Sequence, residues 1–307
     1  MIILDDNQIK DKITIQEAIT VMRNAFYDRY EQNLSSPPRY NIGNDGKIVI
    51  TLGENKKLNI SGFRCYNLYG EKDDQFITVI NTKSGEIKGI IIGNYIGTLR
   101  TGAIGALSID LLAKKNSKIL SVIGLGNQAM IQTLCALNVR NINEIRVFSP
   151  TQNHREKFIN TLQNRTHINI INCTNSNEAI IDSDIIITAT TSKMPVINSD
   201  YISNGTHIVW VGNKHKSSSE VGDDVILRSN KIFTDSMEQL NSYKNSHKLE
   251  NIISNRGPYE LSDLICGKIN GRVNDNDITV FASVGLSGTE VMLADYIMNN
   301  FNNHLYN

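Results

Sequence analysis

The sequence predicts an α/β protein, in which a doubly wound parallel sheet is combined with a discontinuous α+β domain. Two observations carry this prediction. From residue 117 onward, short apolar runs alternate with helical segments, a pattern typical of parallel strands joined by crossover helices. Between residues 47 and 93, β-type runs instead follow one another with only turn signals between them, which favours antiparallel pairing.

Composition limits the classes of function. The 307 residues contain 31 Lys+Arg and 31 Asp+Glu, so the net charge is zero. This balance removes the strongest electrostatic argument for a nucleic-acid or membrane partner, since both usually need a basic excess. Four scattered cysteines without a CxxC pair favour a reducing cytoplasm and no metal site. The apolar run at the N-terminus is too short for a signal peptide. We therefore expect a cytoplasmic enzyme or a small-molecule binding protein.

The N-terminal part begins with one clear helix. Thr14 and Glu17 form a capping box, and apolar residues follow at helical spacing until the Pro37-Pro38 pair, which cannot continue a helix. Four strands and a further helix are predicted after it: strands at 48–52, 58–66, 75–81 and 87–92, and a helix at 100–115.

Six apolar runs mark the strands of the parallel sheet, at 118–123, 144–148, 168–173, 184–189, 207–211 and 231–234. The tail, 278–307, is predicted to be a strand followed by a helix, which together pack back on the N-terminal part. The expected domains are therefore 117–275, a dinucleotide-binding unit, and 1–116 with 276–307, a second unit built from both ends of the chain.

The sharpest local signal is the segment from Gly124 to Ala129, which fits G-x-G-x-x-[G/A] between a strand and a helix. Gly124 permits a tight turn, Gly126 lets the backbone approach a pyrophosphate, and Ala129 lets the helix pack closely on the strand. The helix N-terminus then offers N–H groups to the phosphates. Such glycines are often no more than a tight turn, but the repeating strand–helix pattern around them favours a Rossmann dinucleotide site.

The choice of cofactor depends on the end of the second parallel strand. NAD-binding domains usually place Asp or Glu there, to accept a hydrogen bond from the ribose. This chain has neither, whereas Ser149, Thr151, His154 and Arg155 could donate to a 2′-phosphate. NADP(H) is therefore favoured over NAD(H), although His154 and Arg155 would also suit an ordinary solvated helical turn.

Three arginines outside the parallel sheet are candidates for binding a carboxylate. Arg39 follows two prolines, Arg64 lies in an apolar strand, and Arg100 precedes Thr101-Gly102 in a helix. A guanidinium group is the natural bidentate partner of a carboxylate, although any one of these residues alone could be structural. His215, in a loop after the fifth parallel strand, is a candidate acid–base group or an ordinary loop histidine.

Taken together, these segments resemble the ornithine cyclodeaminase/mu-crystallin family. The most specific segments are Leu99-Arg100-Thr101-Gly102-Ala103 and Gly124-Leu125-Gly126-Asn127-Gln128-Ala129. Further matches, in chain order, lie at 36–39, 62–64, 81–85, 188–192, 211–220, 267–272 and 279–285.

The resemblance implies a Rossmann domain and a second domain that binds substrate and forms a homodimer. It places Arg39 and Arg100 at positions that bind the substrate carboxylate, and Arg64 is a further candidate for the same role. It also implies cofactor contacts along the chain, at Thr101, Gly124, Leu125, Gly126, Asn127, Gln128, Ala129, Thr190, Thr191, Ser192, Val211, Ser283 and Gly285, beside Ser149, Thr151 and Arg155.

Two departures from the family pattern bear on the reaction. The cyclodeaminase branch has an aspartate at the position of Lys214, where it serves the ring-closing chemistry, and the family often has lysine at the position of Arg64. Arginine does not exchange protons near neutral pH. Both changes argue against cyclodeamination and resemble the branch of imino-acid reductases and amino-acid dehydrogenases.

The sequence therefore predicts an NAD(P)H-dependent oxidoreductase that acts on the C–N bond of a small α-imino or α-amino acid. Cyclic ketimine reductases and opine-like or alanine-type dehydrogenases both fit. Lys214 or His215 is the expected proton donor, and water is the alternative. Two rival functions remain: an NAD-recycling ornithine cyclodeaminase, and a mu-crystallin-like protein that binds NADP(H) and a small ligand without turnover.

Overall fold

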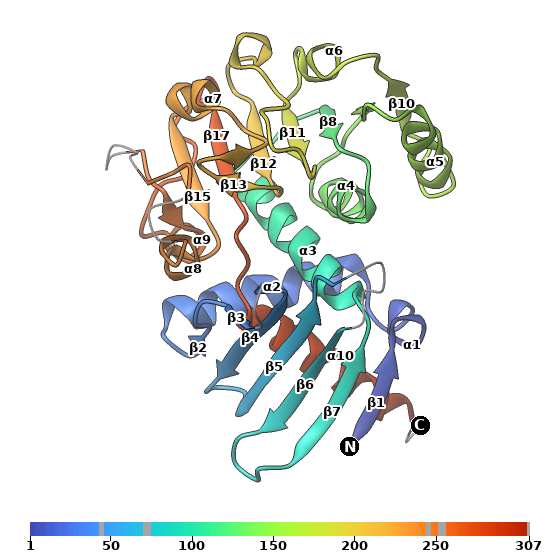
Figure 1. Ribbon diagram of the computed structural model, residues 1–307, viewed down its shortest axis with the longest axis vertical. Helices are drawn as coiled ribbons and strands as arrows, with labels where there is room; N and C mark the ends of the chain where they lie inside the picture. Colours follow the sequence, from blue (N-terminus) through green and yellow to red (C-terminus); the bar gives the residue numbers. More distant parts are fainter. Residues whose placement is uncertain (43–45, 70–74, 244–246, 251–255, 306–307) are drawn as a thin grey trace. The chain divides into compact units, whose positions relative to one another are not determined.

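A computed structural model of the protein describes residues 1–42, 46–69, 75–243, 247–250 and 256–305. The chain forms two compact units: an N-terminal unit, Met1–Ala103 with Gly285–Asn307, and a central unit, Ile104–Val284. Both contain helices and a sheet, which confirms the α/β class (Figure 1). Every helix among the described residues is too short or too polar to cross a membrane.

The sheet of the N-terminal unit has the strand order β1-β7-β6-β5-β4-β2, with β3 added to β4. Pairing is antiparallel except between β1 and β7, so the four predicted antiparallel strands are confirmed as β4 to β7, and β1, β2 and β3 are additions to them. The strands are β1 (Ile2–Asp5), β2 (Leu34–Ser35), β3 (Tyr40–Ile42), β4 (Ile48–Asn55), β5 (Ile60–Asn67), β6 (Gln75–Asn81) and β7 (Ile87–Ile92).

Helices α2 (Ile15–Tyr30) and α10 (Gly288–Leu305) pack together, and α10 lies along one face of this sheet (Figure 1). The predicted capping box starts α2: the Glu17 amide donates to Thr14 Oγ1 at 3.1 Å, and the Thr14 amide donates to Glu17 Oε2 at 2.8 Å. The remaining helices of this part of the chain are α1 (Asp6–Lys10) and α3 (Tyr95–Leu112).

Alternate residues of β4 face α10, as the period of a strand requires. Val49, Thr51 and Gly53 are buried on this side, whereas Leu52 between them is exposed. A Cβ at Gly53 would lie 2.4 Å from the Cα atom of Gly288, so this glycine allows the first turn of α10 to touch the strand. The start of α10 is therefore held against β4.

The central unit contains an eight-stranded sheet of order β10-β9-β8-β11-β12-β17-β15-β16, in which every neighbouring pair is parallel. This confirms the doubly wound prediction. Its strands are β8 (Ile119–Ile123), β9 (Glu144–Phe148), β10 (Asn169–Asn172), β11 (Ile185–Thr188), β12 (His207–Trp210), β15 (Lys231–Thr234), β16 (Tyr259–Glu260) and β17 (Thr279–Ala282).

Short helices and one small hairpin connect these strands. They are α4 (Asn127–Val139), α5 (Gln152–Gln163), α6 (Ser176–Ile180), η1 (Ser199–Tyr201), the hairpin β13 (Lys214–His215) with β14 (Ser218–Ser219), α7 (Asp223–Arg228), α8 (Met237–Asn241) and α9 (Leu261–Ile265).

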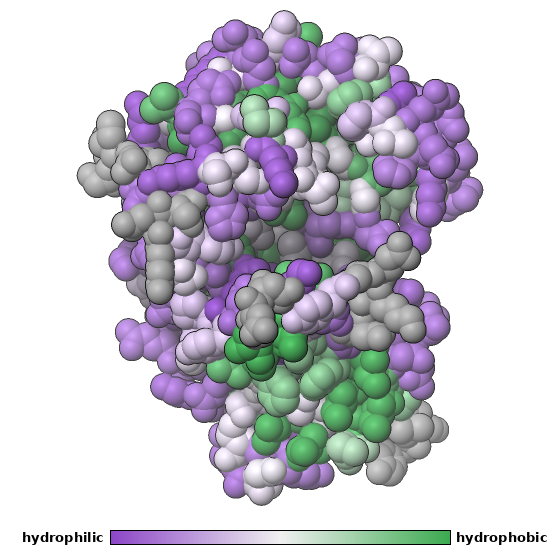
Figure 2. Space-filling view, in the orientation of Figure 1, coloured by the Kyte–Doolittle hydropathy of each residue, from purple (hydrophilic) through white to green (hydrophobic). Residues whose placement is uncertain are grey.

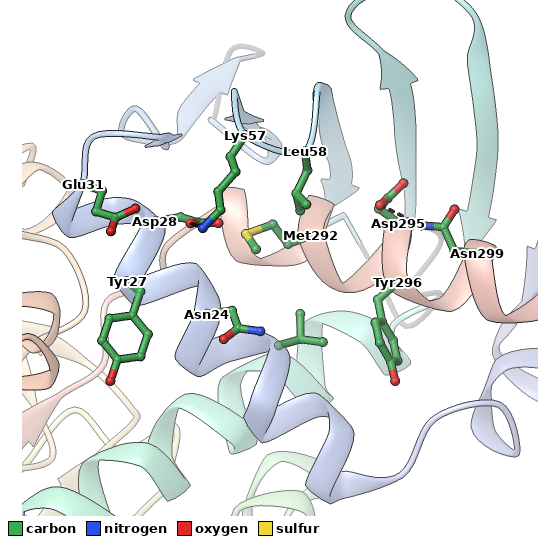
Figure 3. Close-up of a pocket in the computed structure, with 11 residues that line it drawn as sticks. Asn24, Tyr27, Asp28, Glu31, Lys57, Leu58, Met292, Asp295, Tyr296 and Asn299 are labelled. Carbon is green, nitrogen blue, oxygen red and sulfur yellow. Dashed lines mark hydrogen bonds and ion pairs between the residues drawn. The ribbon is translucent and has the colours of Figure 1, made fainter.

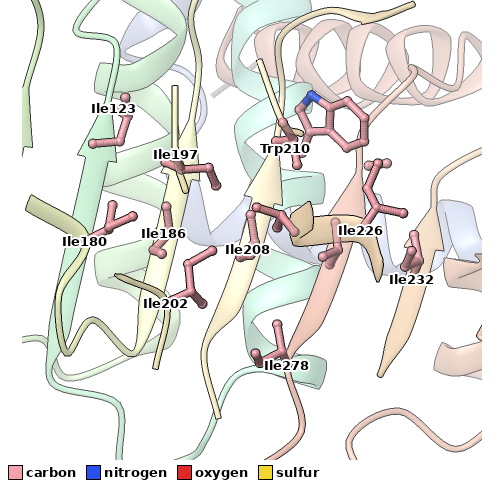
Figure 4. Packing of buried hydrophobic residues seen from close by; sticks show 14 of the residues in the cluster. Ile123, Ile180, Ile186, Ile197, Ile202, Ile208, Trp210, Ile226, Ile232 and Ile278 are labelled. Carbon is pink, nitrogen blue, oxygen red and sulfur yellow. The ribbon is translucent and has the colours of Figure 1, made fainter. Parts of the chain in front are cut away.

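An isoleucine-rich core covers one face of the parallel sheet. Ile186, Ile208 and Ile232 lie on β11, β12 and β15, and they pack with Trp210 and with side chains from α6 and α7 (Figure 4). All four residues of β11 are buried, as are all four of β12. Such runs of buried branched residues are typical of a sheet covered on both faces, and they make the central unit a rigid support for the loops at its edge.

The tail of the chain is divided differently from the prediction. β17 lies between β12 and β15 in the parallel sheet, and only the residues from Gly285 onward belong to the N-terminal unit. The other boundary falls inside α3, after Ala103, rather than after residue 116. The strand pattern of 279–282 suits either sheet, because periodicity does not specify which neighbours a strand will pair with.

A fully buried histidine of β12, His207, contacts hydroxyl groups of α3 and β17. His207 Nε2 lies 3.2 Å from Ser108 Oγ, and Nδ1 lies 2.9 Å from Thr279 Oγ1. Burial, followed by the positive charges of Arg272 and Arg140, holds the pKa of His207 well below its usual range. The folded protein therefore keeps this imidazole neutral.

This depressed pKa predicts a loss of stability in mild acid. Below about pH 6.5 the unfolded chain protonates the histidine and the folded chain does not, so stability should fall by up to about 1.4 kcal/mol per pH unit. Urea unfolding of His207→Gln between pH 7 and 5 should show a shallower decline than the wild type. His154→Gln, at an exposed position, is the control, and equal slopes for all three proteins would contradict the prediction.

Candidate functional site

The turn between β8 and α4 has the geometry of a phosphate-binding loop. Gly124 has φ +86°, and a Cβ there would lie 2.5 Å from the carbonyl oxygen of Ala189, so only glycine fits. Gly126 is the N-cap of α4, which has no side-chain cap. A Cβ on Gly126 would meet no atom within 4 Å. The protein itself thus does not require glycine at this position, whereas a ligand that approaches the backbone would.

This turn lies where the strand order of the sheet reverses. β8 is flanked by β9 on one side and β11 on the other, so the loops after β8 and β11 diverge above the sheet. Thr190, just after β11, lies beside the turn: a Cβ on Gly124 would be 2.6 Å from its Cγ2 atom. Ligands of doubly wound sheets bind at this kind of switch point.

A buried carboxylate holds the loop after β11 in place. Glu220 has no exposed surface, and its Oε2 accepts from the amide and the hydroxyl of Thr190, both at 2.7 Å. Its Oε1 accepts from Thr188 Oγ1 at 2.9 Å and from the Gly212 amide at 2.6 Å. Four donors from the ends of β11 and β12 thus converge on one side chain, which fixes the start of the segment that includes Thr191 and Ser192.

The predicted 2′-phosphate residues lie at the end of β9. Ser149 is buried, Thr151 is the exposed N-cap of α5, and Arg155 follows in its first turn. The Arg155 guanidinium donates through Nη1 to the carbonyl oxygens of Ser149 and Pro150. It therefore lies against the β9–α5 loop, and its role in binding a 2′-phosphate stays a prediction.

The two predicted proton donors occupy the hairpin after β12. The Lys214 ammonium is largely buried and donates to the carbonyl oxygens of Val211 at 3.1 Å and Gly212 at 2.7 Å. It also lies 5.1 Å from the centre of the Trp210 ring. His215 is exposed and packs against Tyr243, with the two ring centres 5.2 Å apart.

Val211 and Ser283 continue the parallel ladder beyond β12 and β17. The Val211 amide donates to the carbonyl of Thr188 at 2.9 Å, and the Ser283 amide donates to that of Trp210 at 3.0 Å. Ser283 Oγ also donates to the buried carboxylate of Asp235 at 3.2 Å. These contacts place both predicted cofactor residues at the carboxyl edge of the sheet, the edge that carries the phosphate-binding turn.

In the N-terminal unit, two predicted substrate arginines meet at one glycine. A Cβ on Gly285 would lie 3.4 and 3.5 Å from Nη2 and Nη1 of Arg100, and 3.7 Å from Nη2 of Arg39. Gly285 has φ +95°, a backbone conformation that favours glycine, whereas an added Cβ would make only ordinary van der Waals contacts with these guanidinium groups. Arg100 Nη1 is buried and has no hydrogen-bond partner among the described residues. Such an orphaned donor beside a second guanidinium suits an anionic ligand.

The third arginine reaches this pair through a glutamate. Glu290 Oε1 lies 2.6 Å from Arg64 Nη1 and 2.9 Å from both Nε and Nη2 of Arg100. Burial alone would raise the pKa of Glu290, but the guanidinium groups of Arg64 and Arg100 outweigh it and hold the pKa below its usual value. The glutamate is thus ionised, and it offsets part of the positive charge of the arginines.

The structure groups most of the predicted residues within each unit. The phosphate-binding turn, Val211 and Ser283 share the carboxyl edge of the parallel sheet, whereas Arg39, Arg100 and Gly285 form a separate cluster. Thr101 follows Arg100 in α3, where its hydroxyl donates to the Gly97 carbonyl at 2.7 Å. Their roles remain predictions.

Sequence reasoning missed the carboxylates that organise these groups: Glu220, Asp235 and Glu290. For Glu290 a signal existed, because an acid in the apolar segment 288–298 has to find a partner.

A pocket of about 530 Å³ lies elsewhere in the N-terminal unit, between α2, α10 and the turn after β4 (Figure 3). Val21, Leu58 and Met292 line it, together with polar groups that include Asp28 and Asp295. None of the predicted site residues is among the residues that line it. In the part of the chain that the structure describes, no group of three or more His, Cys, Asp or Glu side chains could hold a metal ion.

The model of the ornithine cyclodeaminase/mu-crystallin family matches residues 1–304. The chain belongs to this family. Among family relatives, a Δ1-pyrroline-2-carboxylate reductase of Bacillus thuringiensis is 30% identical over 256 residues, which cover 82% of this chain and 75% of the relative.

Two solved structures extend the comparison. The Δ1-pyrroline-2-carboxylate reductase of Thermococcus litoralis, in complex with NADH and L-proline, has a TM-score of 0.92 and 26% identity and covers 99% of this chain and 98% of its own. An archaeal alanine dehydrogenase dimer with bound NAD has a TM-score of 0.90 at 22% identity, with 99% and 97% covered. The predicted class, an oxidoreductase acting at a C–N bond, is confirmed by the reductases among these relatives.

The open space at Gly126 predicts a separation of cofactor binding from stability. Gly126→Val should leave the melting temperature near that of the wild type, because the added side chain meets no protein atom. It should raise the dissociation constant for the nicotinamide cofactor at least about tenfold, because the side chain blocks close approach of the pyrophosphate. Calorimetric titration and thermal unfolding measure the two quantities.

Gly124→Val is the matched control for this substitution, since its side chain would clash with the protein itself and should lower the melting temperature. Unchanged cofactor affinity in a folded Gly126→Val protein would remove this turn from the cofactor site.

Proposed function

We propose that the protein is an NAD(P)H-dependent reductase of a small cyclic α-imino acid, with Δ1-pyrroline-2-carboxylate as the first substrate to test. The observation that carries the proposal is the pair of guanidinium groups at Gly285, one with a buried donor that has no hydrogen-bond partner in the part of the chain that the structure describes. The names of the family relatives supply the chemical class.

The arginine pair suits the carboxylate of such a substrate. Arg100 offers Nη1 and the outer edge of its guanidinium, and Arg39 offers a second positive group close by. A carboxylate held between them would make charge-assisted hydrogen bonds at a fixed place. Because the imine carbon is attached directly to this carboxylate, binding at one end orients the reacting end and lowers the entropic cost of the reaction.

The reaction reduces the C=N bond to a CH–NH bond, and it consumes one hydride and one proton. A bound nicotinamide cofactor would supply the hydride. The groups that fit it are the uncapped first turn of α4, with open space over Gly126, and the loop braced by Glu220. Lys214 remains the proposed proton donor, with His215 as the second candidate. The Lys214 ammonium is held near the switch point by two carbonyl oxygens.

The position of Lys214 supports reduction rather than cyclodeamination. The carboxylate that the cyclodeaminase branch uses at this place is replaced by an ammonium group, which repels a substrate amine instead of binding it. Arg64 likewise stands at the position where the family often has a lysine, and it is paired with Glu290. No described contact favours ammonia release from ornithine.

The proposal predicts turnover with a defined set of substrates. Purified protein should oxidise NADPH or NADH with Δ1-pyrroline-2-carboxylate, Δ1-piperideine-2-carboxylate, or pyruvate with an amine, as followed by absorbance at about 340 nm. Proline formation from ornithine without added reductant would instead establish a cyclodeaminase. Tight cofactor binding with no turnover of any substrate would establish a binding protein.

We infer that NADP(H) is preferred, because the 149–155 segment has no carboxylate to accept from a ribose hydroxyl and has Arg155 in the following turn. The same assay compares the two cofactors: kcat/KM for NADPH should exceed that for NADH. An equal or reversed ratio would refute this preference.

We also propose that the protein is a homodimer, joined through the face of the N-terminal sheet that is turned away from α10. One row of directly paired residues crosses this face: Ile3, Ile90, Thr78, Phe63 and Leu52. Ile3 is 57% exposed and Leu52 37%. Figure 2 shows hydrophobic side chains gathered over this sheet. An exposed apolar surface of this kind is typical of an interface, and the related alanine dehydrogenase is a dimer.

Charges on this face should therefore separate the subunits. Leu52→Lys combined with Ile92→Lys should halve the mass measured by sedimentation, because two buried ammonium groups per subunit would cost more than a dimer contact gains. Leu227→Lys, at a position of α7 that is 71% exposed, is the control and should leave the mass unchanged. A wild-type protein that sediments as a monomer would refute the homodimer.

A further inference from the structure

We infer that Glu290 is a positioning residue for the substrate carboxylate: it holds one edge of the Arg100 guanidinium so that the other edge faces the ligand. This inference rests on the proposed function, since it assumes that Arg100 binds a carboxylate. It assigns to Glu290 and Arg64 an indirect role that the sequence did not predict.

The geometry begins with the placement of Glu290 in the first turn of α10. This turn touches β4, where Gly53 lets the helix approach closely. Glu290 is 1% exposed, and its second oxygen, Oε2, is 3.4 Å from the hydroxyl of Thr51 on the same strand. A carboxylate in this position has little freedom to move, and it is surrounded by protein rather than by water.

Arg64 anchors this carboxylate from the sheet. Its Nη1 donates to Glu290 at 2.6 Å, and its Nε donates to Gln75 Oε1 at 2.8 Å. The guanidinium also lies 4.6 Å from the centre of the Tyr66 ring. A Cβ on Gly97 would lie 2.5 Å from Arg64 Nη1, so α3 provides the space for this arrangement. The hydrogen bonds of Arg64 thus go to protein groups, so its role in this arrangement is to hold Glu290 in place.

The consequence for Arg100 follows from the shape of a guanidinium group. Glu290 Oε1 occupies the edge formed by Nε and Nη2. The donors that remain are those of Nη1, which is buried and meets no acceptor among the described residues, and the outer hydrogen of Nη2. Together they form the end of the fork, which is the edge that binds a carboxylate in bidentate fashion. Arg39 lies near this end, at Gly285.

Without Glu290, Arg100 would lose this restraint. Its long side chain would sample other rotamers, and binding a substrate would then have to restore one of them. The loss should affect ligands with a carboxylate and spare those without one. Cofactor binding to the central unit should not change.

The test uses Glu290→Gln, which keeps the shape of the side chain and removes its charge. The probes are pyrrole-2-carboxylate, a planar ring acid that a hydride donor does not reduce, and its carboxamide. We expect the dissociation constant of the carboxylate, and KM for Δ1-pyrroline-2-carboxylate, to rise about tenfold or more, in line with the strength of charged hydrogen bonds. Affinities for the carboxamide and for the cofactor should stay the same.

A double-mutant cycle distinguishes positioning from a general structural role. Arg100→Ala should weaken carboxylate binding more than Glu290→Gln does, and the double variant should bind no worse than Arg100→Ala alone, because Glu290 acts through Arg100. Additive losses, or unchanged carboxylate binding in Glu290→Gln, would overturn the inference. If Glu290→Gln does not fold, Glu290→Asp takes its place. This substitution keeps the negative charge but moves it away from Arg100 by one methylene, and it should give a smaller rise in the same dissociation constant and KM.

Asp295→Asn is the matched control. Asp295 is a second buried carboxylate of α10, paired with Lys88 and with Asn299, and it lines the separate pocket of Figure 3. Its substitution should lower stability without changing carboxylate binding. Because equilibrium binding requires no turnover, a protein that binds pyrrole-2-carboxylate but reduces no substrate would refute the proposed function and still test Glu290. A wild type that binds no carboxylate would overturn both.

Discussion

Buried carboxylates organise the candidate groups within each of the two units. A buried carboxylate is costly unless it accepts several hydrogen bonds or meets positive charge. Glu220 meets this demand with four donors from the ends of β11 and β12, and Glu290 meets it with two guanidinium groups. In each case the requirement of the carboxylate fixes the groups around it. The switch-point loop and the candidate arginines Arg64 and Arg100 therefore owe their positions to these two buried side chains.

The parts of the fold that depend on short-range pattern could be predicted from the sequence. The capping box of α2, the strands β4 to β7 and the phosphate-binding turn all follow from residues within a few positions of one another. β1 was missed because its three apolar residues gain a partner only in β7, far along the chain. The location of β17 between β12 and β15 was missed for a related reason, since a crossover can insert a strand anywhere in a parallel sheet.

The same limit applies to the site. Arg64 and Arg100 were identified as candidates by their neighbours in the sequence, but their common partner lies 226 and 190 residues away. An arginine in an apolar strand looks identical in the sequence whether it faces a ligand or an internal acid. Only the three-dimensional contact separates the two cases, and it divides the three arginines into one pair that meets at Gly285 and one that holds Glu290.

The division of the chain also sets an order of events during synthesis. The sheet of the N-terminal unit is translated first, yet the helix that covers its face and the glutamate that neutralises its arginines come from residues 285–305. The central unit, by contrast, has all its strands once residue 282 has been made. Until residue 290 has been made, Arg64 and Arg100 therefore lack the carboxylate that pairs with both of them. The arginine cluster of the N-terminal unit can thus be completed only after every strand of the parallel sheet has been translated.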